Sequence, residues 1–325
     1  MIKNRDNSAY KKMPAVVRFS CKKTILTLLA GYWLFSPGLA YPRNVAVVSS
    51  RKVPYFADAV NGIKKAFDAD KNSAVIDIFY SEDRGCLAQL KAKKYDVICP
   101  LGVGAAKEIA GEFKDVAVVF SLVVDPVWAK IVPSMQPSAG NICGVSLLVQ
   151  AQVQVAIIRK IVPGLRKVGI IYEGMSRSFY DELNSLDGLT IKAQEVPEPT
   201  KVPSAMVSFT SDNTGAFILV LDSDIYNKDS LAYVLNYTVT NKIPTMVFSS
   251  NMVKAGALLG FVYDYTDLGV QTGEMILDVL KGKSPAQIPI AVPRKLGYAL
   301  NLKVAEAIGL NISGDVVKSA VETYR

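Results

Sequence analysis

Short apolar runs alternate with segments of helical periodicity along most of this 325-residue chain. Within residues 55–68, for example, apolar side chains recur every three or four positions, which is typical of a helix with one buried face. The apolar runs on either side, at residues 44–49 and 74–80, have the length that is usual for buried strands. Strands that alternate with helices predict βαβ units and a parallel sheet. The sequence therefore predicts an α/β fold.

The alternation occurs twice. Strands are predicted at residues 44–49, 74–80, 96–99 and 116–120, and again at residues 167–172, 190–196, 216–221 and 245–248. A chain of this length usually forms two domains, and we expect two Rossmann-like lobes with parallel sheets, joined by a hinge. The first lobe is predicted to comprise residues 41–146 and about 259–283, and the second residues 147–258 and about 284–325.

The amino terminus has a composition of its own. Residues 1–40 carry seven basic side chains and one acidic side chain, with a basic pair before an apolar run at residues 24–35. This order predicts a signal peptide that is cleaved after Ala40, which places the mature chain in the periplasm or outside the cell. The run is too short to span a bilayer, which takes about 20 residues; an uncleaved anchor is the alternative. Whether translation starts at Met1 or Met13 stays open.

The remainder of the chain has almost balanced charge, with 30 basic and 28 acidic residues. A nucleic-acid-binding protein would gather Lys and Arg on one face, so no nucleic-acid partner is expected. The chain contains no histidine, which excludes Ser-His-Asp and Cys-His catalysis and His-based zinc sites. We predict no metal and no cofactor. An enzyme of the Ser-Lys or paired-carboxylate type stays open.

Three cysteines follow the predicted signal peptide: Cys86, Cys99 and Cys143. Their odd number and the absence of a CxxC motif argue against a disulfide framework. Cys99 and Cys143 fall on strand patterns and are expected to be small buried hydrophobic side chains. Secretion would permit one disulfide, so the redox state of the three thiols stays open.

A pair of glycines, Gly102 and Gly104, follows a predicted strand and opens a helix, as in dinucleotide-binding loops. Lys107 occupies the third glycine position, and no such motif ends the first strand, so a nucleotide site is not expected. The backbone N–H groups of residues 101–105 would nevertheless suit a carboxylate or another anion. Glycines that only make a tight turn are the alternative.

Small hydroxyls and tyrosines recur where the predicted strands end, and open α/β sheets bind ligands beyond the carboxyl ends of their strands. In residues 116–146, for example, Ser121 and an Asp125-Pro126 turn follow a strand. Such groups bind small polar or aromatic molecules, although a single serine more often caps a helix or turn. The candidate ligand-binding residues are Ser50, Tyr55, Leu101, Gly102, Val103, Ser121, Asp125, Tyr172, Ser176, Ser178, Ser249 and Tyr263.

Five longer stretches resemble one family, the ABC transporter substrate-binding proteins whose best-known members bind tryptophan or tyrosine. The stretches are VVFSLVVDPVWAKIV (118–132), GNICGVS (140–146), IVPGLRKVGIIYEG (161–174), GALLGFVYDYTDLGVQTGEMILDVLKGKSPAQIPI (256–290) and LNLKVAEAIGLNI (300–312). The resemblance covers nearly all of the predicted mature chain, and the last two stretches are the most specific. It implies the type I periplasmic binding fold, in which two lobes close around a ligand.

The resemblance also implies which residues face the ligand. They are Ser121, Asp125 and the loop 100–104 from the first lobe, and the turn 173–178, Asp222 and Ser249 from the second. The chain departs from the family pattern in three loops that shape the pocket, at residues 52–55, 100–103 and 177–178.

The function implied by the resemblance is not enzymatic. The chain would be the solute-binding component of an ABC importer, which captures a small molecule such as an aromatic amino acid and delivers it to a membrane permease driven by an ATPase. A monomer is expected. The alternative is a periplasmic ligand-binding sensor that signals to a kinase or chemoreceptor. A secreted enzyme is a third hypothesis, and it predicts turnover of the bound compound.

Overall fold

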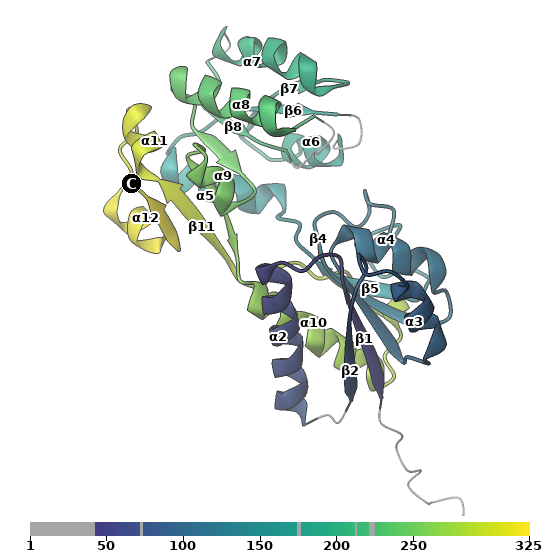
Figure 1. Cartoon of the computed structure of the whole chain (residues 1–325). Helices are drawn as coiled ribbons and strands as arrows, with labels where there is room; N and C mark the ends of the chain where they lie inside the picture. Colours follow the sequence, from purple (N-terminus) through teal and green to yellow (C-terminus); the bar gives the residue numbers. More distant parts are fainter. Residues whose placement is uncertain (1–42, 72–73, 174–176, 212, 221–224) are drawn as a thin grey trace, which may run out of the picture. The chain divides into compact units, whose positions relative to one another are not determined.

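The computed structural model describes residues 43–325 apart from 72–73, 174–176, 212 and 221–224 (Figure 1). The predicted signal peptide, Ser176 and Asp222 therefore lie outside the described residues. The described part forms two sheets, each covered by helices, so the predicted α/β fold with two lobes and mainly parallel sheets is confirmed. No helix within the described ranges is long and apolar enough to cross a membrane.

The first lobe contains a five-stranded sheet in the order β2-β1-β3-β4-β5, with every neighbouring pair parallel. Its strands are β1 (Asn44–Ser49), β2 (Val75–Tyr80), β3 (Val97–Leu101), β4 (Ala117–Val123) and β5 (Ile142–Ser146). In the interior strand β1, Val45 and Val47 face one side, whereas Ala46 and Val48 face the other, and all four are fully buried. Burial on both faces explains why the strand is a continuous apolar run.

Helices cover both faces of this first sheet. The helices α2 (Pro54–Asp70) and α10 (Tyr265–Leu280) share a core with one face, and α3 (Cys86–Ala92) and α4 (Val103–Glu112) share a core with the other. In the sequence, α10 follows most of the second lobe, so the first lobe consists of two segments that are far apart in the chain. Cys86, Cys99 and Cys143 are buried and free, as expected for Cys99 and Cys143.

The second lobe contains a seven-stranded sheet in the order β12-β11-β10-β9-β8-β6-β7. Its strands are β6 (Lys167–Tyr172), β7 (Thr190–Glu195), β8 (Ala216–Ile218), β9 (Thr245–Val247), β10 (Leu259–Tyr263), β11 (Leu296–Asn301) and β12 (Glu322–Tyr324). All pairs are parallel except β10 with β11.

Helices again cover both faces of the second sheet (Figure 1). One core contains residues of α5 (Ala151–Ile161), α6 (Arg177–Asn184) and α11 (Leu302–Ala307), with α12 (Gly314–Ser319) packed beside it. The other core contains residues of α7 (Val202–Ser211), α8 (Lys228–Thr240) and α9 (Ser250–Lys254). Two short 3-10 helices, Pro199–Lys201 and Pro285–Gln287, lie in the connections.

The lobe boundaries differ from the predicted ones in the last third of the chain. We expected residues 259–283 to join the first lobe, but β10 pairs with β9 in the second sheet and only α10 packs on the first. Residues 284–325 were expected in the second lobe, but Ile288 and Ile290 belong to the core of the first. The chain therefore crosses from the second lobe to the first at Asp264, and it crosses back before β11. Nothing in the sequence between β10 and α10 indicates that the chain passes from one lobe to the other there.

Two strands were not predicted at all. Residues 284–297 were expected to be irregular and residues 300–308 to be a helix, but β11 spans Leu296–Asn301. A second helix was expected from about residue 314 to 323, but α12 ends at Ser319 and β12 comes next. β11 has six residues and pairs with β10, whereas β12 has only three and pairs with β11. Pairing over a long sequence separation cannot be read from local periodicity.

Candidate functional site

The side chain of Ser50 forms hydrogen bonds to the end of β3 and to the first turn of α4. Its Oγ donates a hydrogen bond to the carbonyl oxygen of Leu101 (2.8 Å) and accepts one from the backbone N–H of Ala105 (2.9 Å). Both partners lie at the junction of β3 and α4. The hydroxyl predicted to contact a ligand is therefore used to hold this junction in place.

Gly102 makes the junction compact. Its φ of +88° lies in the region that favours glycine, and an added Cβ would lie 2.8 Å from Cζ of Phe56 and 2.9 Å from Oγ of Ser50. The N–H of Gly102 donates to the carbonyl oxygen of Ser121 at 2.8 Å. The next two N–H groups, of Val103 and Gly104, have no hydrogen-bond partner in the described ranges. They lie at the N-terminus of α4, where the helix dipole favours an anion.

Ser121 and Ser146 are completely buried and bonded internally. Oγ of Ser121 accepts a hydrogen bond from the Thr272 hydroxyl of α10 at 2.8 Å, and Oγ of Ser146 donates to the carbonyl oxygen of Val124 at 2.6 Å. Directly after Ser121 the register of β4 against β5 shifts, and Leu122 adopts a φ of 59°. Such a bulge bends a strand and redirects the segment after it; in this lobe that segment is the turn at Asp125.

Asp125 organises this turn with one carboxylate oxygen. Its Oδ1 accepts hydrogen bonds from the N–H groups of Val127 (3.0 Å) and Trp128 (2.9 Å). The segment is a hydrogen-bonded turn, as the Asp125-Pro126 pair predicted. Oδ2 has no partner in the part of the chain that the structure describes. The carboxylate is half-buried and keeps one oxygen available for a donor.

Asp125 lines a cavity of about 380 Å³. The other lining residues are Val127, Trp128, Met135, Leu148, Phe179 and Glu182. Two aromatic rings, a thioether and aliphatic side chains thus surround two carboxylates. Burial raises the pKa of Glu182, against the effect of the Ala151 N–H, which donates to its Oε1 at 2.7 Å. The volume and the mainly apolar lining are typical of small-molecule sites.

Trp128 and Phe179 were not among the predicted site residues. An aromatic residue three positions after the Asp125 turn was a usable signal for Trp128. Phe179 lies on α6 in a predicted helix pattern, where nothing in the sequence separates a ligand-facing ring from a core ring.

Aromatic rings also gather at the start of α2 and α10. The ring centroids of Tyr55 and Tyr265 are 5.2 Å apart, and those of Tyr265 and Tyr263 are 6.1 Å apart. Tyr263 donates a hydrogen bond to the carbonyl oxygen of Leu147 at 3.1 Å, and burial raises the pKa of its phenol. Tyr55 is 41% exposed. The structure thus brings Tyr55 and Tyr263 together around a third tyrosine.

In the second lobe, the structure places only some of the predicted residues. Tyr172 is buried, with its ring stacked on Tyr180 at a centroid distance of 5.5 Å. Ser249 is half-buried at the N-cap of α9 and makes no side-chain cap bond within the described ranges. Ser176, Asp222 and the side chain of Ser178 lie outside the described residues. Within those residues no cluster of side chains could hold a metal ion.

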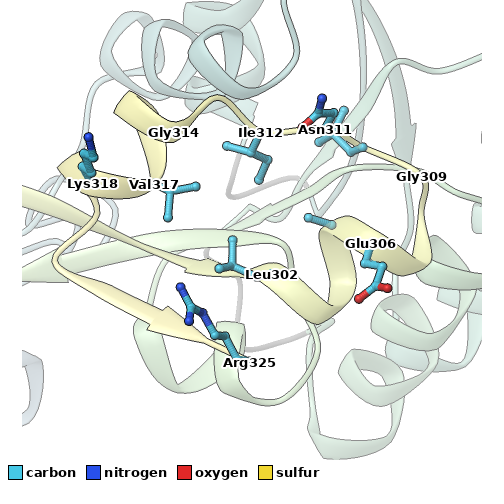
Figure 2. A pocket seen from close by; sticks show the side chains of 11 residues that line it. Leu302, Glu306, Gly309, Asn311, Ile312, Gly314, Val317, Lys318 and Arg325 are labelled. Atoms are coloured by element: carbon cyan, nitrogen blue, oxygen red, sulfur yellow. The ribbon is translucent and has the colours of Figure 1, made fainter.

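A larger hollow of about 740 Å³ lies elsewhere in the second lobe (Figure 2). In Figure 2, Leu302, Ile312 and Val317 face its middle, whereas Lys318 and Arg325 lie at its rim. Because β11 is antiparallel to β10, α11 starts at the amino ends of the parallel strands. That end lies opposite the carboxyl ends where ligands bind in such sheets, and the hollow contains none of the predicted site residues.

Comparison with known proteins gives matches that cover most of the chain. The family model described as ABC transporter substrate binding protein matches residues 45–324. A tyrosine-binding protein of Clostridioides difficile (strain R20291) is 24% identical over 289 residues, 85% of this chain and 84% of the relative.

Solved structures match the fold. An ABC domain in complex with L-Trp from Streptococcus pneumonia is 28% identical, with a TM-score of 0.62 over 87% of this chain and 100% of that one. A ligand-free, open structure of a substrate-binding protein with adhesive properties from Clostridium difficile has a TM-score of 0.71 at 21% identity, over 87% of this chain and 99% of that one. The matched family and these structures are solute-binding proteins and not enzymes.

Proposed function

This chain belongs to the family of ABC transporter substrate-binding proteins, and we therefore propose that it is the extracytoplasmic solute-binding component of an ABC importer. It captures a small molecule between its two lobes and delivers the molecule to a membrane permease that a cytoplasmic ATPase drives. Capture needs no covalent chemistry, because a solute that binds the closed conformation more tightly than the open one drives closure by itself. The predicted signal peptide is consistent with work outside the cytoplasm.

We propose an aromatic amino acid as the solute. Two relatives support this class: one is a tyrosine-binding protein, and the other was solved in complex with L-Trp. The residues of the candidate site match the three parts of such a ligand. Oδ2 of Asp125 suits the ammonium group, the N–H groups of Val103 and Gly104 suit the carboxylate, and Trp128 and Phe179 suit the aromatic side chain.

The observation that carries the proposal is the divided role of Asp125. One oxygen fixes the turn, and the other has no partner among the described residues, beside a cavity with aromatic walls. A half-buried carboxylate oxygen without a donor is costly unless a ligand or water supplies one. Asp125→Asn is the appropriate variant, because its amide oxygen still accepts from Val127 and Trp128 while the charge is removed.

A thermal-shift titration of the purified chain from residue 41 tests both the role and the ligand. At 100 times the dissociation constant, tryptophan or tyrosine should stabilise the native state by about 2.7 kcal/mol, which raises the melting temperature by roughly 5 °C. Asp125→Asn should lose the shift but keep the melting temperature of the free protein. Asp229→Asn, an exposed first-turn carboxylate on α8, is the matched control. A full shift in Asp125→Asn would refute the assigned role.

A further inference from the structure

A second hollow in the first lobe, the α2–β2 groove, has features that the solute site does not explain. It has a volume of about 430 Å³ and lies between α2 and the edge strand β2. Asn61 and Lys64 line it from α2, and Ile78 and Tyr80 from β2. Spacings of three along a helix and two along a strand place each pair on one face, so the groove has two continuous walls.

The floor of the α2–β2 groove is apolar and partly open to solvent. Phe56 and Val60 are buried beneath it, whereas Ile78 is 37% exposed. An edge strand with exposed branched aliphatic side chains invites association with another chain unless something covers it. The described part of the chain leaves this face uncovered.

The rim of the groove is positively charged. Arg51 and Lys64 line it and make no ion pair within the described ranges. Lys52 also lines the groove, but its charge is paired, since its Nζ lies 2.8 Å from Oδ1 of Asp83 and 4.7 Å from the centroid of the Tyr80 ring. Two uncompensated cations beside an apolar floor complement an acidic segment that carries an apolar side chain. A second copy of this chain would bring like charges together, which disfavours self-association.

The position of the groove indicates the partner. It is lined by Ser49 and Tyr80, the last residues of β1 and β2, so it opens at the carboxyl ends of these strands. The loop that leaves β1 carries Ser50, which bonds to Leu101 at the junction of β3 and α4, and it leads into α2, where Tyr55 packs on Tyr265. A partner seated in the groove therefore contacts the loop that holds the β3–α4 junction, where the N–H groups proposed to bind the solute carboxylate lie.

From these observations we propose that the α2–β2 groove docks an acidic, extracytoplasmic segment of the ABC permease, with an apolar side chain of that segment on Ile78 and Phe56. This inference rests on the proposed function, because only an importer component needs a permease. It adds the surface and the chemistry of the contact.

An uptake assay in the source organism tests the docking surface. A strain that lacks the gene is complemented with the wild-type gene or with the double variant Arg51→Glu, Lys64→Glu. The labelled solute is the amino acid that gives the saturable thermal shift. We expect the variant to lower uptake at least about tenfold, as expected for lost charge complementarity, while the dissociation constant of the purified protein for the solute stays within about twofold. The control, Lys318→Glu with Arg325→Glu, changes the charge equally at the hollow of Figure 2 and should leave uptake unchanged.

The outcomes separate the two proposals. If the wild-type gene does not restore uptake, the importer function fails, and the docking surface fails with it. If the wild-type gene restores uptake and the double variant does so equally, only the docking surface is refuted. Loss of solute binding in the double variant would also refute it, because the groove would then belong to the solute site. If the wild-type protein is retained on phosphatidylglycerol vesicles that lack the permease and the double variant is not, the groove binds lipid, and the proposed permease contact is refuted.

Discussion

At the scale of the residue, Asp267 is a buried carboxylate held between cations. Arg294 donates to it from Nε at 3.0 Å and Nη2 at 3.2 Å, and Lys295 contacts it at 2.8 Å. Burial alone would raise the pKa of Asp267, but the hydrogen bonds from Arg294 and Lys295 outweigh burial and hold the pKa below its ordinary value. The contact ties the segment before β11 to the first turn of α10.

Removing the cation Arg294 should destabilise the protein more at neutral pH than at acidic pH. A carboxyl group with a lowered pKa contributes stability above its unfolded pKa of about 3.9, and the contribution is lost as pH falls through the lower folded value. Arg294→Gln should therefore cost about 1–2 kcal/mol at pH 7, since Arg294 is half-exposed and solvent screens the pair. The cost should shrink below about pH 4. Urea unfolding at several pH values measures it. A cost that is constant with pH would contradict this account.

Residue types, but not their partners, could be predicted from the sequence. The turn at Asp125 and the burial of Cys99 and Cys143 were predicted and are confirmed. Serines at the strand ends were predicted to contact a ligand, but the hydroxyls of Ser50 and Ser121 form hydrogen bonds within the lobe. A serine hydroxyl that forms a hydrogen bond within the lobe and one that faces a ligand can have the same local sequence, because the difference lies in residues distant in the chain.

At the scale of the element, α2 and α10 pack with almost no side chains between them. A Cβ added at Gly269 would lie 2.0 Å from the carbonyl oxygen of Ala59. A Cβ added at Gly62 would lie 2.8 Å from Cα of Gly269. Gly269→Ala should therefore force the helices apart and cost about 3 kcal/mol. Gly111→Ala, on α4 with nothing within 4 Å, should instead gain about 0.5 kcal/mol. Denaturant unfolding distinguishes the two. Equal stability of Gly269→Ala and the wild type would contradict the packing.

The elements with strong periodicity were predicted, and those that depend on distant pairing were not. The predicted strands at residues 44–49 and 167–172 coincide with β1 and β6. The strand β12 has three residues and is fixed by β11 and by contacts of Glu322 and Tyr324 with Ser250. Such a strand has too few residues to show a period of its own.

At the scale of the whole molecule, repetition in the sequence was sufficient to predict two lobes. It was not sufficient to place the crossings, because the chain changes lobe at Asp264, one residue after β10 and one before α10. After α10 the chain stays on the first core through Ile288 and Ile290, and it crosses back to the second lobe only before β11. Each of these changes depends on which face a segment buries, a property of the assembled sheets and not of local sequence.

Short crossings suit hinge motion, since a few residues at the ends of elements can absorb the change in backbone angles. If solute binding closes the lobes, the radius of gyration of the purified chain should fall when tryptophan or tyrosine reaches saturation. Small-angle X-ray scattering with and without the amino acid measures this. Asp125→Asn at the same concentration is the control, because it should neither bind nor contract. An unchanged radius of gyration under conditions where calorimetry shows the site to be full would mean that capture occurs without closure, and that the permease recognises occupancy by some other change.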